Sequence, residues 1–162
     1  MKIKDLMAKN LTTVEPTMTL ERAARRMLEK GVSGLPVVDE ENKLVGILSE
    51  TDILMNMKTI VDREVGMRYL SDTTHSLSLF VMLAEKDPEI RDGIFRRLRA
   101  SNVEDAMTTN IISAKPSATL ESVAALMIEH NVNRIPIVDG DKLVGMVTKA
   151  DFARFVATGK SR

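Results

Sequence analysis

Apolar and polar side chains follow one succession of patterns that occurs twice along the chain. Residues 20–30 and 120–130 carry apolar side chains at spacings of three and four, which predicts an amphipathic helix in each stretch. Thr19 and Thr119 stand directly before these stretches, at the position where a hydroxyl is favoured as the N-cap. The pattern therefore predicts helices that begin at equivalent points of two copies.

Segments with the composition of strands surround each predicted helix. In the first copy these are LTTVEP before the helix and LPVVD and KLVGILS after it. The second copy has IISAKP, IPIVD and KLVGMVT in the same places. Proline ends the first segment of each set because it cannot donate to a strand ladder, and polar turns join the other two. With a second helix opening after Ser49 or Thr148, each copy is predicted to be a β-α-β-β-α unit.

The two units form an internal repeat. Residues 3–54 align with residues 103–153 at a constant offset, with one residue fewer in the second polar turn. A single unit of this size buries too little apolar surface to be comfortably stable. We therefore expect a mixed α+β (α/β) fold in which two β-α-β-β-α motifs pack as a pair, sheet against sheet, about a pseudo-twofold axis.

The segment between the repeats, residues 57–101, is too long for a plain loop in a compact domain. Apolar periodicity in its first part indicates helices, and Asp87 followed by Pro88 predicts the start of another. We therefore divide the chain into a first motif at 1–56, a helical insertion, and a second motif at 102–162. The insertion is either a cap or dimer-contact element, or a docking element for a protein or a nucleic acid.

Composition argues against several classes of function. The hydrophobic share is 44% and the charged share 28%, as in soluble globular chains. The formal net charge is zero and aromatic residues make up 3%, which argues against a nucleic-acid partner even though Arg96, Arg97 and Arg99 form a local basic patch. The N-terminal residues lack a signal-peptide core, and the longest apolar run is too short to cross a bilayer. We expect a cytoplasmic protein without a membrane partner.

The chain offers poor material for catalysis or for metal binding. It has no cysteine, and neither of its two histidines, His75 and His130, has a partner at ligand spacing. Neither phosphate-loop pattern occurs, there is no nucleophile elbow, and no pair of carboxylates stands out as an acid–base dyad. We therefore predict no enzyme activity, no catalytic residue, no metal site and no catalytic cofactor.

One repeated element leaves two interpretations open. Ser49-x-x-Asp52 and Thr148-x-x-Asp151 each stand where a predicted strand meets a predicted helix. A hydroxyl at the N-cap with an acid three residues later is close to a capping box, which needs no ligand. The same position also presents free N–H groups that favour phosphate, and a carboxylate one turn into the helix can accept both hydroxyls of a ribose. The pattern alone does not choose between the cap and the ligand site.

Taken whole, the two repeats resemble cystathionine β-synthase (CBS) domains, and the chain looks like a stand-alone tandem pair of them. The resemblance rests on the pattern G-h-h-[ST]-x-x-D, with h apolar, at residues 46–52 and 145–151, each time after a strand such as LPVVD or IPIVD. It leaves the insertion unexplained. In that family two motifs form a disc-like Bateman module whose two clefts bind adenosine-containing ligands such as AMP, ADP, ATP or S-adenosylmethionine, usually to regulate an attached or partner protein.

The resemblance implies that each cleft combines the early strand of one motif with the Ser/Thr-x-x-Asp of the other. The aspartates would hold ribose hydroxyls, the serine or threonine would contact ribose or phosphate, and adenine would lie against the early strand and the backbone near the start of the LPVVD or IPIVD strand. The residues expected to bind the ligand are Leu11, Thr12, Val32, Ser33, Leu35, Ser49, Thr51, Asp52, Ile111, Ile112, Val132, Asn133, Arg134, Ile135, Thr148, Lys149 and Asp151.

The two copies differ in charge at these positions. The second copy has Arg134 and Lys149, whereas the first copy has Glu50 within its motif. Since charge-assisted bonds from arginine favour phosphate and an acid opposes it, we expect the second aspartate's cleft to be the better phosphate site. The other cleft is either empty or takes a less anionic adenosyl group. The alternative for Arg134 is a surface ion pair with Asp139 or Glu129.

The function that these expectations favour is a regulatory module that binds an adenine nucleotide and signals to an unknown protein partner. The alternative is a dimerisation or protein-interaction scaffold without a physiological nucleotide ligand, in which the motifs only cap helices. In either case the resemblance implies a homodimer, because paired CBS modules commonly stack through their helical faces.

Overall fold

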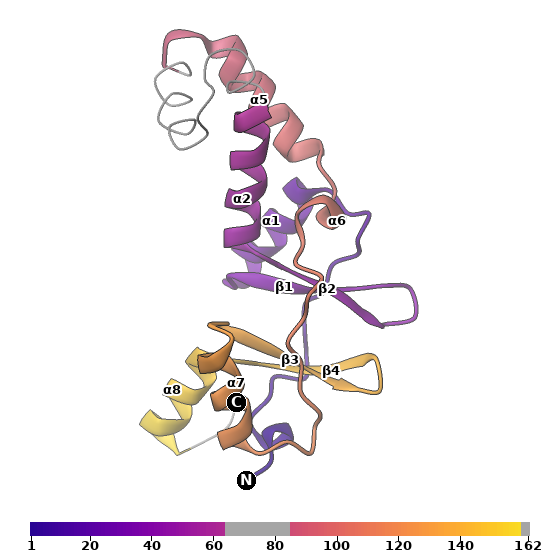
Figure 1. Ribbon diagram of the computed structural model, residues 1–162, viewed down its shortest axis with the longest axis vertical. Coiled ribbons are helices and arrows are strands. Elements are labelled where there is room, and N and C mark those ends of the chain that lie inside the picture. The colour runs from indigo at the N-terminus through magenta and orange to yellow at the C-terminus, as the bar shows by residue number, and fades with distance from the viewer. Residues whose placement is uncertain (64–84, 160–162) are drawn as a thin grey trace.

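The computed structural model of the chain describes residues 1–63 and 85–159, and Figure 1 shows two α+β units stacked along its long axis. The first unit comprises α1 (Leu20–Lys30), β1 (Gly34–Val38), β2 (Leu44–Ser49) and α2 (Glu50–Val61). The second unit comprises α7 (Leu120–Glu129), β3 (Arg134–Asp139), β4 (Lys142–Thr148) and α8 (Lys149–Thr158). In each unit the two strands pair antiparallel, which confirms the predicted order of the last four elements of each repeat.

The early strand of each repeat is shorter than its sequence pattern predicts. It makes one parallel bridge, between Val14 and Val37 in the first unit and between Ala114 and Ile137 in the second. The Val14 N–H donates to the Pro36 carbonyl at 3.1 Å, and the Val14 carbonyl accepts from the Val38 N–H at 3.0 Å. The ladder goes no further because the proline two residues after each bridging residue has no N–H to donate.

The helix ends follow the chemistry that the sequence predicts. The Thr19 side chain accepts from the Arg22 N–H at the start of α1, and Gly31 ends that helix with a φ of 60°. In the insertion, α5 (Pro88–Ala100) has Asp87 as its N-cap, and the Asp87 side chain accepts from the Glu89 N–H. These contacts satisfy donors that a helix N-terminus would otherwise leave unpaired.

Only part of the predicted insertion lies within the described residues. Helix α2 continues past residue 56 and packs against α5, with Val61 and Ile94 fully or almost fully buried between them. This pair extends the first unit away from the second (Figure 1). Residues 64–84, where the periodicity predicts helices and where His75 occurs, lie outside the described residues. No helix that the structure describes is long and apolar enough to cross a membrane.

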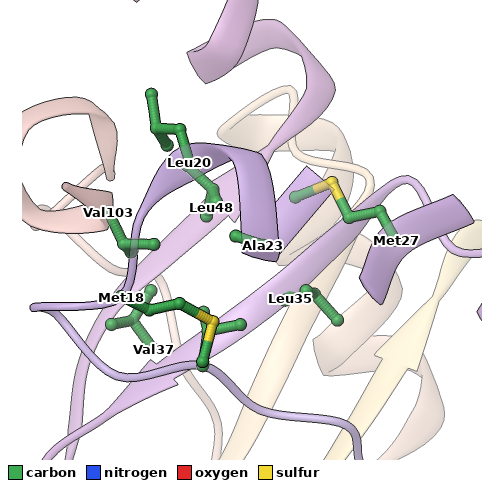
Figure 2. Packing of buried hydrophobic residues seen from close by; sticks show 9 residues of the cluster. Met18, Leu20, Ala23, Met27, Leu35, Val37, Leu48 and Val103 are labelled. Carbon is green, nitrogen blue, oxygen red and sulfur yellow. The ribbon is translucent and has the colours of Figure 1, made fainter. Parts of the chain in front are cut away.

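The short helix that opens each repeat packs into the core of the other unit. Ile3 in η1 (Ile3–Asp5) and the following Leu6 are 0% and 1% exposed and belong to the core of the second unit. Val103 in α6 (Val103–Ala106) belongs to the core of the first unit, as Figure 2 shows. The two hydrophobic cores therefore interlock across the division predicted at residues 56 and 102.

This exchange also explains the glycine of each G-h-h-[ST]-x-x-D motif. A Cβ at Gly46 would overlap the Sδ of Met107, and a Cβ at Gly145 would overlap the Sδ of Met7. Both methionines follow the exchanged short helices, so each glycine accommodates the segment that enters from the other repeat. The glycine is thus a packing requirement of the paired fold.

Two candidate ligand-binding clefts

Two clefts lie between the units, and each combines residues of both repeats as predicted. The Asp52 cleft has a volume of about 340 Å³ and the Asp151 cleft about 580 Å³. The Asp52 cleft is lined by Ser33, Ile47, Ser49, Glu50, Thr51, Asp52, Thr108, Asn110, Ile111, Ile112, Asn131, Val132, Asn133 and Arg134. The Asp151 cleft is lined by Ala8, Asn10, Leu11, Thr12, Lys30, Gly31, Val32, Ser33, Gly34, Leu35, Pro36, Asn133, Arg134, Met146, Thr148, Lys149, Ala150, Asp151 and Arg154.

The structure brings nearly all of the predicted site residues to these clefts. The early segment at Leu11 and Thr12 lies opposite the Thr148 motif, and the segment at Ile111 and Ile112 lies opposite the Ser49 motif. One predicted residue lies in neither lining. Ile135 is 0% exposed and packs in the core of the second unit.

Both Ser/Thr-x-x-Asp elements form capping boxes. The Asp52 Oδ2 accepts from the Ser49 N–H at 2.7 Å, and the Ser49 Oγ accepts from the Asp52 N–H at 3.3 Å. The corresponding distances for Thr148 and Asp151 are 2.9 and 3.3 Å. Each hydroxyl also donates to the same Oδ2 of its aspartate. The capping contacts therefore involve one carboxylate oxygen, Oδ2, and leave Oδ1 available for other hydrogen bonds.

The two Oδ1 atoms have different partners. The Asp52 Oδ1 accepts from the Thr108 hydroxyl at 2.9 Å, whereas the Asp151 Oδ1 forms an ion pair with the Arg154 guanidinium at 3.0 Å. A carboxylate oxygen has two lone pairs, so each Oδ1 retains an acceptor position after this contact. Capping and ligand binding thus do not exclude each other at either aspartate.

The two clefts differ more strongly in the charge of their lining residues than the comparison of the two sequence copies suggests. The ionisable lining residues of the Asp151 cleft are one acid and four bases, namely Asp151, Lys30, Arg134, Lys149 and Arg154. The Asp52 cleft has two acids, Glu50 and Asp52, and shares Arg134. An anionic group is therefore electrostatically favoured in the Asp151 cleft.

Sequence reasoning missed three of the polar groups in this arrangement. Arg154 lies three residues after Asp151 on α8, a spacing that places the two side chains on one helix face and could have identified the ion pair. Lys30 is the last residue of α1 and lines the Asp151 cleft. Thr108 lies in the segment after α6 and lines the Asp52 cleft. No local pattern marks those two, because their positions depend on how the repeats pack.

Arg134 lies where the two clefts meet. Its Nη2 donates to the Ser33 Oγ at 2.7 Å, so the guanidinium lies against the first repeat rather than against Asp139 or Glu129. Burial lowers the pKa of Arg134, and the carboxylates of Glu50 and Asp52 raise it. Because the pKa of arginine is ordinarily above about 12, the side chain remains a cation at neutral pH.

Replacing Gly34 with alanine is expected to destabilise the fold by about 1–3 kcal/mol, the usual cost of overpacking a tight site. A Cβ at this position would overlap the guanidinium of Arg134 and would lie 2.8 Å from the Leu48 carbonyl oxygen of the paired strand. Denaturant-induced unfolding measures the loss of free energy.

Gly93→Ala is the matched control, because a Cβ there has no neighbour within 4 Å and the residue lies inside α5. Alanine is the better helix former by roughly 0.5–1 kcal/mol, so this variant should be neutral or more stable. Equal stability of Gly34→Ala and the natural chain would contradict the close approach at Gly34.

Comparisons with known proteins agree with the paired architecture. The family model described as the CBS domain matches residues 3–59 and 103–158. An uncharacterised protein of Methanocaldococcus jannaschii is 35% identical over 153 residues, which cover 93% of this chain and 88% of that protein. The CBS domain-containing protein YhcV of Bacillus subtilis is 30% identical over 151 residues, 93% of this chain and 82% of its own. The crystal structure of CBSX2 in complex with AMP is similar with a TM-score of 0.67 at 26% identity and 96% coverage of both chains.

Proposed function

The chain belongs to the CBS domain family, and on that premise we propose that it is a regulatory module that binds an adenine nucleotide in the Asp151 cleft. The observation that carries the proposal is the gathering of four cationic side chains around a capped, 3% exposed aspartate between the two repeats. The module acts in the cytoplasm by binding rather than by catalysis, and it signals the occupancy of the cleft to a protein partner. Ligand binding signals because it favours one arrangement of the paired units over another.

Each part of a nucleotide has a counterpart in the Asp151 cleft. The Asp151 Oδ1 accepts from a ribose hydroxyl, and the N-terminus of α8 with Lys149 and Lys30 attracts the phosphates. The adenine lies against Leu11 and Thr12. The AMP complex of CBSX2 supports the class of ligand, and AMP, ADP and ATP all present these groups.

The Asp52 cleft suits a different member of the same ligand class. Its two carboxylates repel a phosphate, but Asp52 retains an acceptor position for a ribose hydroxyl. S-adenosylmethionine carries a sulfonium cation in place of phosphate, and it is the adenosyl ligand that this charge favours. We therefore assign the less anionic ligand to the Asp52 cleft.

Exposed apolar side chains on the helices favour self-association, which is also the basis of the scaffold alternative. Leu28 on α1 and its counterpart Ile128 on α7 are 82% and 78% exposed, and Val156 on α8 is 86% exposed. Equivalent apolar residues on both units allow a second copy to cover both at once. We propose a homodimer formed through these helical faces.

AMP at about a hundred times its dissociation constant is expected to raise the melting temperature of the protein by roughly 5–10 °C. A ligand that binds only the native state at this excess stabilises it by about 2.7 kcal/mol, and each kcal/mol corresponds to roughly 2–4 °C in a chain of this size. Thermal-shift measurements with AMP, ADP, ATP and S-adenosylmethionine make the test.

GMP is the matched control, because it carries the same ribose and phosphate with another purine. The protein must first be shown by mass spectrometry to be free of bound nucleotide. If no adenosyl ligand then raises the melting temperature, the scaffold is the better description of the chain.

A further inference from the structure

The two repeats provide one cation where their clefts meet. Residue 134 opens β3, and the residue that opens β1 at the equivalent position of the first repeat is Gly34. The Arg134 side chain fills the space that a side chain at Gly34 would need, since a Cβ there would overlap the guanidinium. The pseudo-twofold arrangement therefore accommodates one large side chain at this point, and Arg134 is a lining residue of both clefts.

In the structure the guanidinium lies against Ser33, a residue that lines both clefts. The Ser33 Oγ accepts from its Nη2 at 2.7 Å, and the carboxylates of Glu50 and Asp52 attract it. Arg134 is the one basic residue that lines the Asp52 cleft among the residues that the structure describes. Without it, two acids would face any ligand there.

We propose that Arg134 is a cation shared between the clefts, so that a phosphorylated ligand in either cleft lowers the affinity of the other for a second anion. The inference rests on the proposed nucleotide binding and adds the regulation of the two sites by each other. A phosphate in the Asp151 cleft competes with Ser33 for the guanidinium and neutralises its charge. The Asp52 cleft then presents its acids uncompensated, and by thermodynamic linkage the effect is reciprocal.

Blocking the Asp151 cleft is therefore expected to improve AMP binding in the Asp52 cleft by about tenfold, within the usual range for coupled sites. Leu11→Trp fills the Asp151 cleft from a residue that does not line the other one. Two-dimensional ¹H–¹⁵N NMR titration with AMP gives a separate binding curve for each cleft, from the amides of Thr51 and Ala150. The Thr51 curve of Leu11→Trp is compared with that of the natural chain.

Removing the shared cation separates this coupling from direct repulsion between two phosphates. In the Arg134→Gln background Leu11→Trp is expected to leave the Thr51 curve unchanged, and in the natural background it should leave the curve for uncharged adenosine unchanged. A tenfold gain that persists with glutamine at 134 overturns the proposal, as does an equal AMP affinity of the Asp52 cleft with the Asp151 cleft open or blocked. If neither amide of the natural chain responds to AMP, the proposed function fails, and the inference fails with it.

A second variant tests the same cation without filling a cleft. Ser33→Ala removes the acceptor that holds the Arg134 guanidinium where the two clefts meet. The guanidinium is then more available to a phosphate in the Asp151 cleft, so the Ala150 curve should shift to at least threefold tighter AMP binding. Unchanged or weaker binding in this variant overturns the proposal.

Discussion

Asp151→Asn is expected to weaken AMP binding by about a hundredfold. Its carboxylate is buried, its Oδ2 is engaged in the cap, and its Oδ1 is the atom that we assign to a ribose hydroxyl. Hydrogen bonds to a charged group contribute about 1.5–3 kcal/mol each, and about 2.7 kcal/mol corresponds to a hundredfold change in affinity. Asparagine keeps the size and one oxygen of the side chain, so the cap is retained while the charge is lost. Isothermal titration calorimetry measures the affinity.

Asp52→Asn is the matched control for this change. Asp52 has the same place in its own capping box, but its cleft contains Glu50 and is the weaker phosphate site. We expect the AMP affinity of the tighter site to change by less than about threefold in this variant, because the substitution lies outside that site. Loss of AMP binding in Asp52→Asn together with normal binding in Asp151→Asn would reverse our assignment of the clefts.

Much of the fold was predictable because the signals are local or repeated. The N-caps at Thr19 and Thr119 and the start of α5 at Asp87 each depend on one side chain and the next turn of backbone. Because of the repeat, the pattern of each helix and strand occurs twice in the same order. This is why the order of helices and strands could be predicted from one sequence. The crossed composition of the clefts was predictable only through the resemblance to a paired family.

The parts that were not predictable depend on contacts between distant segments. Nothing near Ile3 or Val103 in the sequence indicates that each packs into the core of the other repeat. The comparison of the two copies showed that Arg134 gives the second one an additional charge, but only the packing shows why residue 34 must be small. The pattern of apolar residues along a chain predicts which face of a helix or strand is buried. It does not predict which other face packs against it, and these features depend on that packing.

Leu6→Ala is expected to destabilise the protein by about 2–5 kcal/mol, the usual cost of truncating a fully buried leucine. Leu6 belongs to the first repeat but is 1% exposed because it packs with the core of the second unit. A backbone hydrogen bond also joins this N-terminal segment to the second repeat, since the Ile3 N–H donates to the Ala118 carbonyl at 2.8 Å. Denaturant-induced unfolding measures the loss, and Leu6→Met, which conserves volume, should cost less than about 1.5 kcal/mol.

Because the two cores interlock, we also expect Leu6→Ala to affect the unfolding of both units. The chain that follows α6 continues into the second unit, and Val103 of that helix is part of the core of the first unit. Leu6→Ala should therefore reduce hydrogen-exchange protection by a similar factor at the amides of Leu48 in the first unit and Val147 in the second. If protection falls at Val147 alone, the two units unfold independently and the exchange of short helices does not couple them. A similar loss in both units would mean that one substitution at the start of the first repeat weakens the whole pair, because each repeat completes the core of the other.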